Sequence, residues 1–104
     1  MNSKRKGNAG EIELLRIFKR HGLQARRNLQ QFVGGKNNPD IALDVHGILY
    51  HVEVKRTERL RLYEAMRQAA RDADGRAVPI IAHRRSREPW SVTMLLEDWL
   101  SMNQ

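Results

Sequence analysis

Hydrophobic residues recur at helical spacing near the start of the chain. Over residues 8–21, Leu14, Leu15 and Phe18 fall on one side of a helix and form an apolar stripe. Gly22 follows directly and is typical of the position just after a helix, where the backbone turns left-handed. The pattern therefore predicts a first helix that packs this stripe against a core.

Hydrophobic and polar residues alternate with a period of two in the next part of the chain. The alternation runs over residues 41–45 and again over residues 48–54, and His46-Gly47 between them suits a tight hairpin turn. We therefore predict two antiparallel strands joined by two residues. Other short apolar runs predict strands over residues 23–28, 77–83 and 90–95.

Two later segments return to helical spacing. Residues 60–74 are rich in Ala, Arg and Met and end at Gly75, and residues 96–102 predict a short closing helix. A loop rich in glycine and asparagine over residues 32–38 separates the first two strands. The predicted order, α-β-β-β-α-β-β-α, indicates an α/β fold with a central mixed sheet flanked by helices.

The two faces of the predicted hairpin differ in chemistry. Alternation along the second strand puts four apolar residues on one face, Ile48, Tyr50, Val52 and Val54. The opposite face carries Leu49, His51, Glu53 and Lys55, and Asp40 falls on the same face of the first strand. Asp40, Glu53 and Lys55 are therefore expected to converge at one place.

Length and composition limit the classes of protein. At 104 residues with 40% hydrophobic residues, the chain is expected to form one domain over residues 8–104, preceded by a basic, flexible arm over residues 1–7. It has no cysteine, so we expect neither a disulfide framework nor a thiolate metal site. No apolar run approaches the ~18 residues of a membrane span, and no signal peptide is evident. We expect a cytoplasmic protein of a bacterial, archaeal or phage-infected cell.

The net charge of +7 indicates a polyanionic partner. Basic residues cluster near the ends of predicted elements, where they can follow a phosphate backbone. A generally basic protein without such a partner, or an RNA-binding protein, would also explain the charge. The candidate DNA-binding residues are Lys4, Arg5, Lys6, Arg26, Arg27, Lys36, Arg56, Arg59, Arg84 and Arg85.

Asp40 and the triplet Glu53-Val54-Lys55 carry the candidate chemistry. Each carboxylate alone is usually a surface group, but two on one sheet face can hold a divalent cation. Oxygen ligands favour Mg²⁺, with Mn²⁺ as a substitute, and the Val54 carbonyl is a further candidate ligand. A lysine beside such a cation can orient a water molecule, which suits phosphodiester hydrolysis.

Glu11 is a candidate third carboxylate of this site. It shares the apolar stripe of the first helix, where an acid needs a partner. Capping or an interaction with the helix dipole is the alternative. Glu13, in contrast, has Arg16 and Arg20 at helical offsets and is assigned to the solvated face of the helix.

Gln68 and the histidines are weaker candidates. Gln68 alone resembles a solvated helix residue, whereas His51 shares a sheet face with Glu53 and is expected beside the site. His21, His46 and His83 show no ligand spacing, so zinc is not expected.

With these residues in place, the chain resembles the PD-(D/E)XK nuclease superfamily, and it is similar to the small Holliday junction resolvases of archaea and phages. The opening KRKGNAGEIELLRIFKRHGLQARR is similar to theirs, a basic arm and a glycine before a helix with an early glutamate. Pro39-Asp40 and Glu53-Val54-Lys55 match the signature motif, and Gln68 matches a glutamine common in these nucleases. The resemblance covers roughly residues 4–95.

The resemblance implies an αβββαβ core, Mg²⁺-dependent cleavage of branched DNA and a homodimer. It implies that Glu11, Asp40 and Glu53 surround the metal, that Lys55 orients or activates water, and that Gln68 supports the site. Two features depart from archaeal resolvases: no serine-containing stretch precedes Pro39, and the segment around Trp90 is more like phage versions. The alternatives are a virus-type replication-repair nuclease and a non-catalytic DNA-binding module on the same fold.

Overall fold

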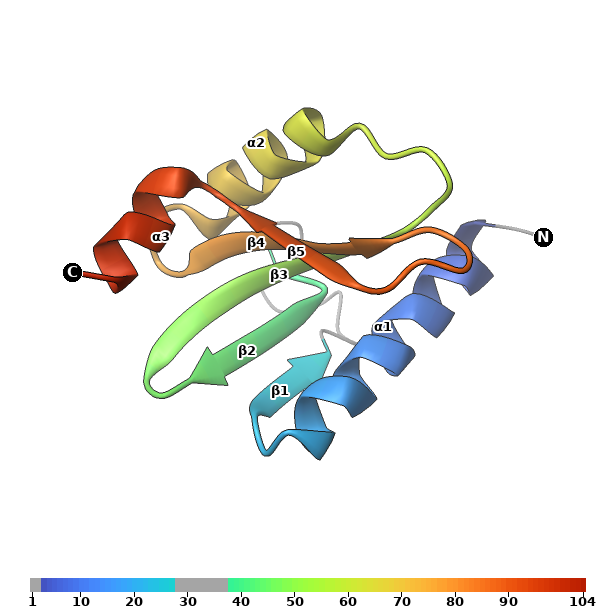
Figure 1. Ribbon diagram of the computed structural model, residues 1–104, viewed down its shortest axis with the longest axis horizontal. Helices are drawn as coiled ribbons and strands as arrows, with labels where there is room; N and C mark the ends of the chain where they lie inside the picture. The colour runs from blue at the N-terminus through green and yellow to red at the C-terminus, as the bar shows by residue number, and fades with distance from the viewer. Residues whose placement is uncertain (1–2, 28–37) are drawn as a thin grey trace.

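The chain folds into a five-stranded sheet with helices on both faces (Figure 1). The computed structural model describes residues 3–27 and 38–104, and for residues 3–7 the backbone alone. The predicted order of helices and strands and the α/β class are confirmed. The elements are α1 (Ser3–Arg20), β1 (Gln24–Arg27), β2 (Ile41–Val45), β3 (Ile48–Arg56), α2 (Leu62–Ala73), β4 (Val78–Arg84), β5 (Ser91–Met94) and α3 (Leu96–Met102).

The sheet is mixed, with strand order β1-β2-β3-β4-β5. Only the central pair, β3 and β4, is parallel, and α2 forms the crossover between them; the other three pairs are antiparallel. Helix α1 packs on one face against β1 and β3, and α2 packs on the other face against β3 and β4. β3 therefore carries both helices, one on each of its faces.

The two faces of β3 bury different cores, as the alternation predicts. On the α1 face, Leu14 packs with Leu43, Val52 and Val54, and the stripe residues Leu15 and Phe18 join them. On the α2 face, a smaller cluster holds Met66, Ala69 and Ile81. The polar face of β3 is thus covered by a helix with small side chains, which leaves room for charged groups beside it.

The β2–β3 hairpin has the predicted two-residue turn. His46 and Gly47 both have positive φ, 53° and 87°, which is the requirement of a type I′ turn. The Gly47 N–H donates to Asp44 Oδ1 at 2.9 Å and holds the turn. The turn fixes a register in which Ile41 pairs with Val52. The position of Asp40 relative to Glu53 depends on this register.

Helix α1 differs from its predicted form at its N-terminal end. It begins at Ser3 rather than at residue 8, so residues 3–7 are helical where we expected an arm. Lys and Arg are good helix formers, and they extend the helix past Gly7 although the apolar stripe starts later. At Gly10 the helix comes close to β3, since a Cβ there would lie 3.1 Å from the Arg56 Cβ. This close approach positions the first turns of the apolar stripe over β3.

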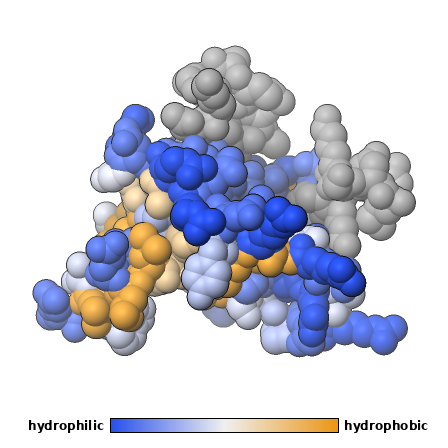
Figure 2. Space-filling model, turned by 90° about the horizontal axis from the view of Figure 1, so that it is seen from above, coloured by the Kyte–Doolittle hydropathy of each residue, from blue (hydrophilic) through white to orange (hydrophobic). Residues whose placement is uncertain are grey.

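Hydrophobic side chains are exposed at the end of the molecule where α3 lies. They are three residues of α3: Leu96, Trp99 and Leu100. Figure 2 shows the hydrophobic colour gathered at this end, while much of the same view is hydrophilic. In the part of the chain that the structure describes, no helix is both long and apolar enough to span a membrane.

Candidate active site

Asp40 and Glu53 come together at the edge where β2 begins. Asp40 directly precedes β2, and continuing the register from Ile41 and Val52 places it opposite Glu53. The two side chains are hydrogen-bonded to each other, and the Val54 N–H donates to Asp40 Oδ2 at 2.9 Å. The predicted meeting of Asp40 with the Glu53 triplet is present in the structure; the catalytic roles of these residues stay a prediction.

The surroundings of Asp40 disfavour its charged form. Burial and then the negative charge of Glu53 raise the pKa of Asp40 from 3.8 to about 7, with a smaller contribution from Glu11, while the Val54 N–H acts in the opposite direction. Such a shift marks a place where carboxylates outnumber the positive charges that would stabilise them. This donor set, the neighbouring carboxylates of Asp40 and Glu53 with Glu11 close to them, fits a divalent cation with oxygen ligands.

Glu11 faces this group from α1, and Arg27 of β1 holds it in place. The Arg27 Nε and Nη2 both donate to Glu11 Oε1, at 3.1 and 3.0 Å, and Arg27 also donates to Asn8 Oδ1. Both side chains of the ion pair are less than a fifth exposed. Arg27, a predicted DNA-binding residue, is therefore engaged within the protein, and it balances one of the three carboxylates.

Lys55 lies two residues beyond Glu53 on the face of β3 that α2 covers. Its register partner in parallel β4 is His83, whose Nε2 lies 2.9 Å from Thr93 Oγ1. Burial lowers the pKa of His83, which favours its neutral form beside the lysine. Within the described residues, no carboxylate pairs with Lys55. The ammonium is therefore available to a ligand.

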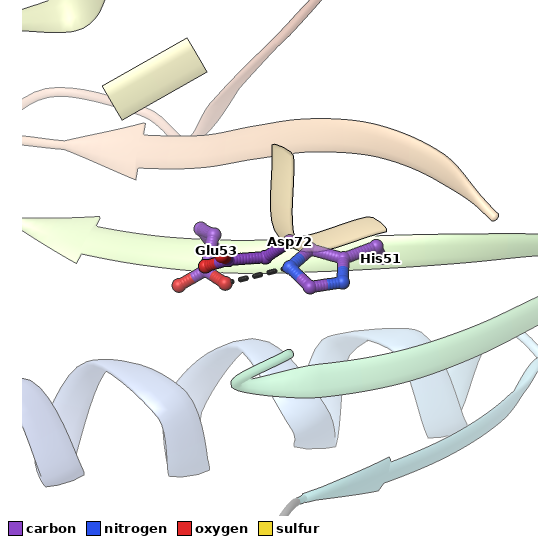
Figure 3. A group of neighbouring side chains, drawn as sticks. All are labelled: His51, Glu53 and Asp72. Atoms are coloured by element: carbon purple, nitrogen blue, oxygen red, sulfur yellow. Dashed lines mark hydrogen bonds and ion pairs between the residues drawn. The ribbon is translucent and has the colours of Figure 1, made fainter. Parts of the chain in front are cut away.

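His51 and Asp72 join Glu53 on the same face (Figure 3). His51 Nε2 lies 2.8 Å from Glu53 Oε2, and one ligand atom from each of His51, Glu53 and Asp72 lies within 4.8 Å of the others. Strand alternation predicted His51 as a neighbour of the site, but sequence reasoning missed Asp72. The available signal was its position one turn after Gln68 on a helix whose buried side is formed by Met66, Ala69 and Ala73.

Gln68 is exposed on α2, and no hydrogen bond from it is present in the described part of the structure. The residue that α2 brings to Glu53 is Asp72 instead. No contact in the described part of the structure supports the role predicted for Gln68, which stays a prediction.

The predicted DNA-binding residues fall into three groups. Arg26, Arg59 and Arg85 are exposed, and Arg85 makes only a loose surface pair with Glu88. Lys36 lies outside the described residues, as do the side chains of Lys4, Arg5 and Lys6. Arg56 and Arg84, described next, are partly buried.

Arg56 and Arg84 are neighbours at the ends of parallel β3 and β4, and both reach Glu13. Arg56 Nε lies 3.8 Å and Arg84 Nη1 3.6 Å from the Glu13 carboxylate. Glu13 is 40% exposed and lines one surface of α1 with Arg16 and Arg20, but its ion-pair partners are Arg56 and Arg84 of the sheet. Helical offsets within α1 do not show the sheet arginines that the tertiary fold brings closer.

This combination, a mixed sheet with two helices and an Asp–Glu–Lys group at one edge, defines the PD-(D/E)XK class of nucleases. A solved structure of the Holliday junction resolvase Hjc from the archaeal hyperthermophile Archaeoglobus fulgidus shares the fold, with a TM-score of 0.64 and 25% sequence identity over 81% of this chain and 72% of that one. The family model of the archaeal Holliday junction resolvases (Hjc) matches residues 2–102, so the chain belongs to this family. No curated protein sequence matches significantly.

Family membership confirms the resemblance and the predicted function class, a structure-selective endonuclease that acts on DNA junctions. It favours the resolvase interpretation over the virus-type nuclease and the RNA-binding alternative. The family is one of metal-dependent nucleases that bind branched DNA, and the acidic group around Glu53 agrees with that chemistry.

Proposed function

We propose that this protein is a Mg²⁺-dependent resolvase that hydrolyses phosphodiester bonds in four-way DNA junctions. The observation that carries the proposal is the contact between Asp40 and Glu53, where burial and then the negative charge of Glu53 raise the pKa of Asp40 to about 7. A bound cation would stabilise the charged forms of both carboxylates, because its attraction for them offsets their mutual repulsion.

The oxygen donors of this group favour Mg²⁺, with Mn²⁺ as a substitute. We assign the carboxylates of Asp40 and Glu53 and the Val54 carbonyl as ligands, with Glu11 close enough to act through a water molecule. When bound, the cation supplies positive charge to the scissile phosphate and acidifies the attacking water.

Lys55 and Arg27 complete the proposed site. The Lys55 ammonium, on the Glu53 face of β3, orients the attacking water and adds positive charge near the phosphate. Arg27 fixes Glu11 through two hydrogen bonds to one oxygen, so Glu11 keeps its orientation while DNA binds. The supporting role of Gln68 stays a prediction, and it rests on no contact in the described residues.

The DNA backbone is proposed to cross the end of the sheet where β3 and β4 finish. Lys55, Arg56 and Arg84 lie there in adjacent strands, and a cavity of about 270 Å³ beside His83 and Arg85 opens at the same end. The exposed Arg26 and Arg59, and the basic residues of the N-terminal segment, are proposed to extend this surface along the phosphates.

We further propose a homodimer, since a four-way junction has two-fold symmetry and needs two cuts. The exposed Leu96, Trp99 and Leu100 of α3 support a self-complementary contact, away from the strand ends that carry Lys55, Arg56 and Arg84. Trp99→Lys should convert a dimer to a monomer in multi-angle light scattering, while Tyr63→Lys, at a residue 80% exposed on α2, should not. A monomeric wild-type protein, with and without junction DNA, would refute the dimer.

Cleavage of a panel of DNAs tests the enzymatic proposal. With Mg²⁺ or Mn²⁺, the wild-type protein should cut a four-way junction in preference to flap, duplex and single-stranded DNA. Asp40→Asn and Lys55→Ala should each lower the cleavage rate by about 10²–10⁴ while junction binding persists in Ca²⁺. A wild-type protein that binds junctions and cuts none of these DNAs would instead establish the alternative, a non-catalytic DNA-binding module. A cytoplasmic location, where DNA is accessible, is part of the proposal.

A further inference from the structure

Glu53 has partners on two sides, and only one of them belongs to the proposed Mg²⁺ site. On one side it is hydrogen-bonded to Asp40. On the other side its Oε2 lies 2.8 Å from His51 Nε2, and the His51 side chain is only 3% exposed. A buried imidazole that touches a carboxylate is a strong donor group, and the nuclease chemistry described above does not use it.

Asp72 adds a third donor from a different element. It comes from the last turns of α2 and is partly buried, and its ligand atom lies within 4.8 Å of those of His51 and Glu53. A four-coordinate metal with bonds of about 2.0–2.2 Å holds its ligands about 3.3–3.6 Å apart. Metal binding would therefore lengthen the contact between His51 and Glu53 slightly and draw Asp72 toward them (Figure 3).

The ligand atoms of His51, Glu53 and Asp72 differ in kind from those of the proposed Mg²⁺ site. One imidazole nitrogen with two carboxylate oxygens suits Zn²⁺ or Mn²⁺, whereas Mg²⁺ prefers oxygen ligands and keeps its waters. Binding through Nε2 requires the His51 tautomer that carries its proton on Nδ1. The metal would then replace the hydrogen bond between the imidazole and Glu53.

A cavity gives access to two of the three side chains, His51 and Asp72. A cavity of about 180 Å³ lies between the β2–β3 hairpin and the end of α2, and His51 and Asp72 both line it. Arg76 also lines this cavity, but its guanidinium lies 3.2 Å from the Asp74 carboxylate and is drawn toward that acid. A cation can therefore reach the group from a side that the catalytic lysine does not occupy.

We propose that His51, Glu53 and Asp72 form a binding site for a transition metal ion of the Zn²⁺ type, bridging β3 and α2. The inference rests on the proposed function only in that Glu53 is shared with the Mg²⁺ site. The sequence did not predict zinc, because three of the histidines show no ligand spacing. The ligands here are His51 and two carboxylates, and Asp72 reaches them only through the packing of α2 on the sheet. The competing interpretation is a metal-free network in which His51 merely orients Glu53.

Zinc binding to the metal-free protein, measured by isothermal titration calorimetry, separates these interpretations. The wild-type protein should bind one Zn²⁺ at this site, and Asp72→Asn should weaken that binding by at least about tenfold. Asp74→Asn is the matched control, since it removes the same charge two residues away at the exposed end of α2. Equal affinity in wild type, Asp72→Asn and Asp74→Asn, or no binding in the wild type, would overturn the proposal.

Nitrogen NMR of the histidines provides a second, independent measurement. At a Zn²⁺ concentration that just saturates the wild type, the Nε2 resonance of His51 should shift in the wild type and in Asp74→Asn, and much less in Asp72→Asn. An unchanged His51 resonance while zinc binds elsewhere would also overturn the site. Asp40→Asn should still bind Zn²⁺ at His51 although it no longer cuts DNA, so failure of the zinc site and failure of the nuclease proposal are observed separately.

Discussion

Two groups of charged side chains lie on opposite faces of β3, and their charges are balanced in opposite ways. On the α1 face, one carboxylate, Glu13, faces two guanidinium groups, those of Arg56 and Arg84. At the other group, Asp40 and Glu53 share a hydrogen bond, and Asp72 stands close to Glu53. The first group has an excess of positive charge, and the second has an excess of negative charge.

This difference separates the two kinds of ligand that the molecule takes. The positive group lies at a strand end with partly exposed side chains and attracts phosphates, which bind from solvent. At the negative group, burial and then the charge of Glu53 raise the pKa of Asp40. The sign of the excess charge explains why a small cation suits one group and a polyanion suits the other.

The largest expected effect comes from removing a charge of the negative group. In metal-free protein, folded Asp40 keeps its proton up to a pKa of about 7, whereas the unfolded chain releases it near 3.8. The folded state therefore binds more protons between these values, and the free energy of unfolding should fall by on the order of 3–4 kcal/mol as the pH rises through this window. Asp40→Asn should remove this fall and be more stable than wild type above pH 7.

Urea denaturation in EDTA across this pH range measures the effect. Asp44→Asn is the control, because it lies on the same strand and its amide oxygen still accepts the Gly47 N–H. Adding Mg²⁺ should stabilise the wild type and Asp44→Asn but not Asp40→Asn. If the free energy of unfolding changed with pH in the same way in all three proteins, the ionisation of Asp40 would not destabilise the fold.

A smaller effect is expected from Arg27→Gln, which removes the cation that balances Glu11. The variant loses two charged hydrogen bonds between partly buried groups, so the free energy of unfolding should drop by about 1–3 kcal/mol. It should also raise the pKa of Asp40 further, because the charge of Glu11 is no longer offset. Arg26→Gln, at the exposed neighbouring position of β1, should change stability by no more than about 0.5 kcal/mol. Equal losses in the two variants would contradict the pairing of Arg27 with Glu11.

The smallest change in stability is expected from Glu13→Gln, on the positive side of the comparison. Its side chain is 40% exposed, so losing the two ion pairs should cost less than about 1 kcal/mol. DNA binding should become tighter at low salt and more salt-dependent, with a slope steeper by about 1–2 in log–log form, because two arginines are freed for phosphates. Glu97→Gln on α3 provides the same change in net charge at the opposite end. Identical salt slopes for both variants would show that Glu13 does not restrain the arginines.

Much of this architecture is determined locally and is therefore visible in the sequence. Alternation over β2 and β3, with His46-Gly47 at the turn, sets a register in which Asp40 must face Glu53. The helical stripe of Leu14, Leu15 and Phe18 likewise indicates which side of α1 meets the core. Periods of two and 3.6 residues follow from backbone geometry alone, so they sort side chains to faces without knowledge of the fold.

Contacts between side chains of different elements are set by tertiary packing and are not visible in the sequence. Glu13 pairs with sheet arginines rather than with those of its own helix, because Gly10 lets α1 approach Arg56 closely. Asp72, rather than Gln68, reaches Glu53 and His51, because the packing of Met66 and Ala69 sets the rotation of α2 over the sheet. Such contacts depend on the position of one element against another, which side-chain packing fixes and no local period encodes.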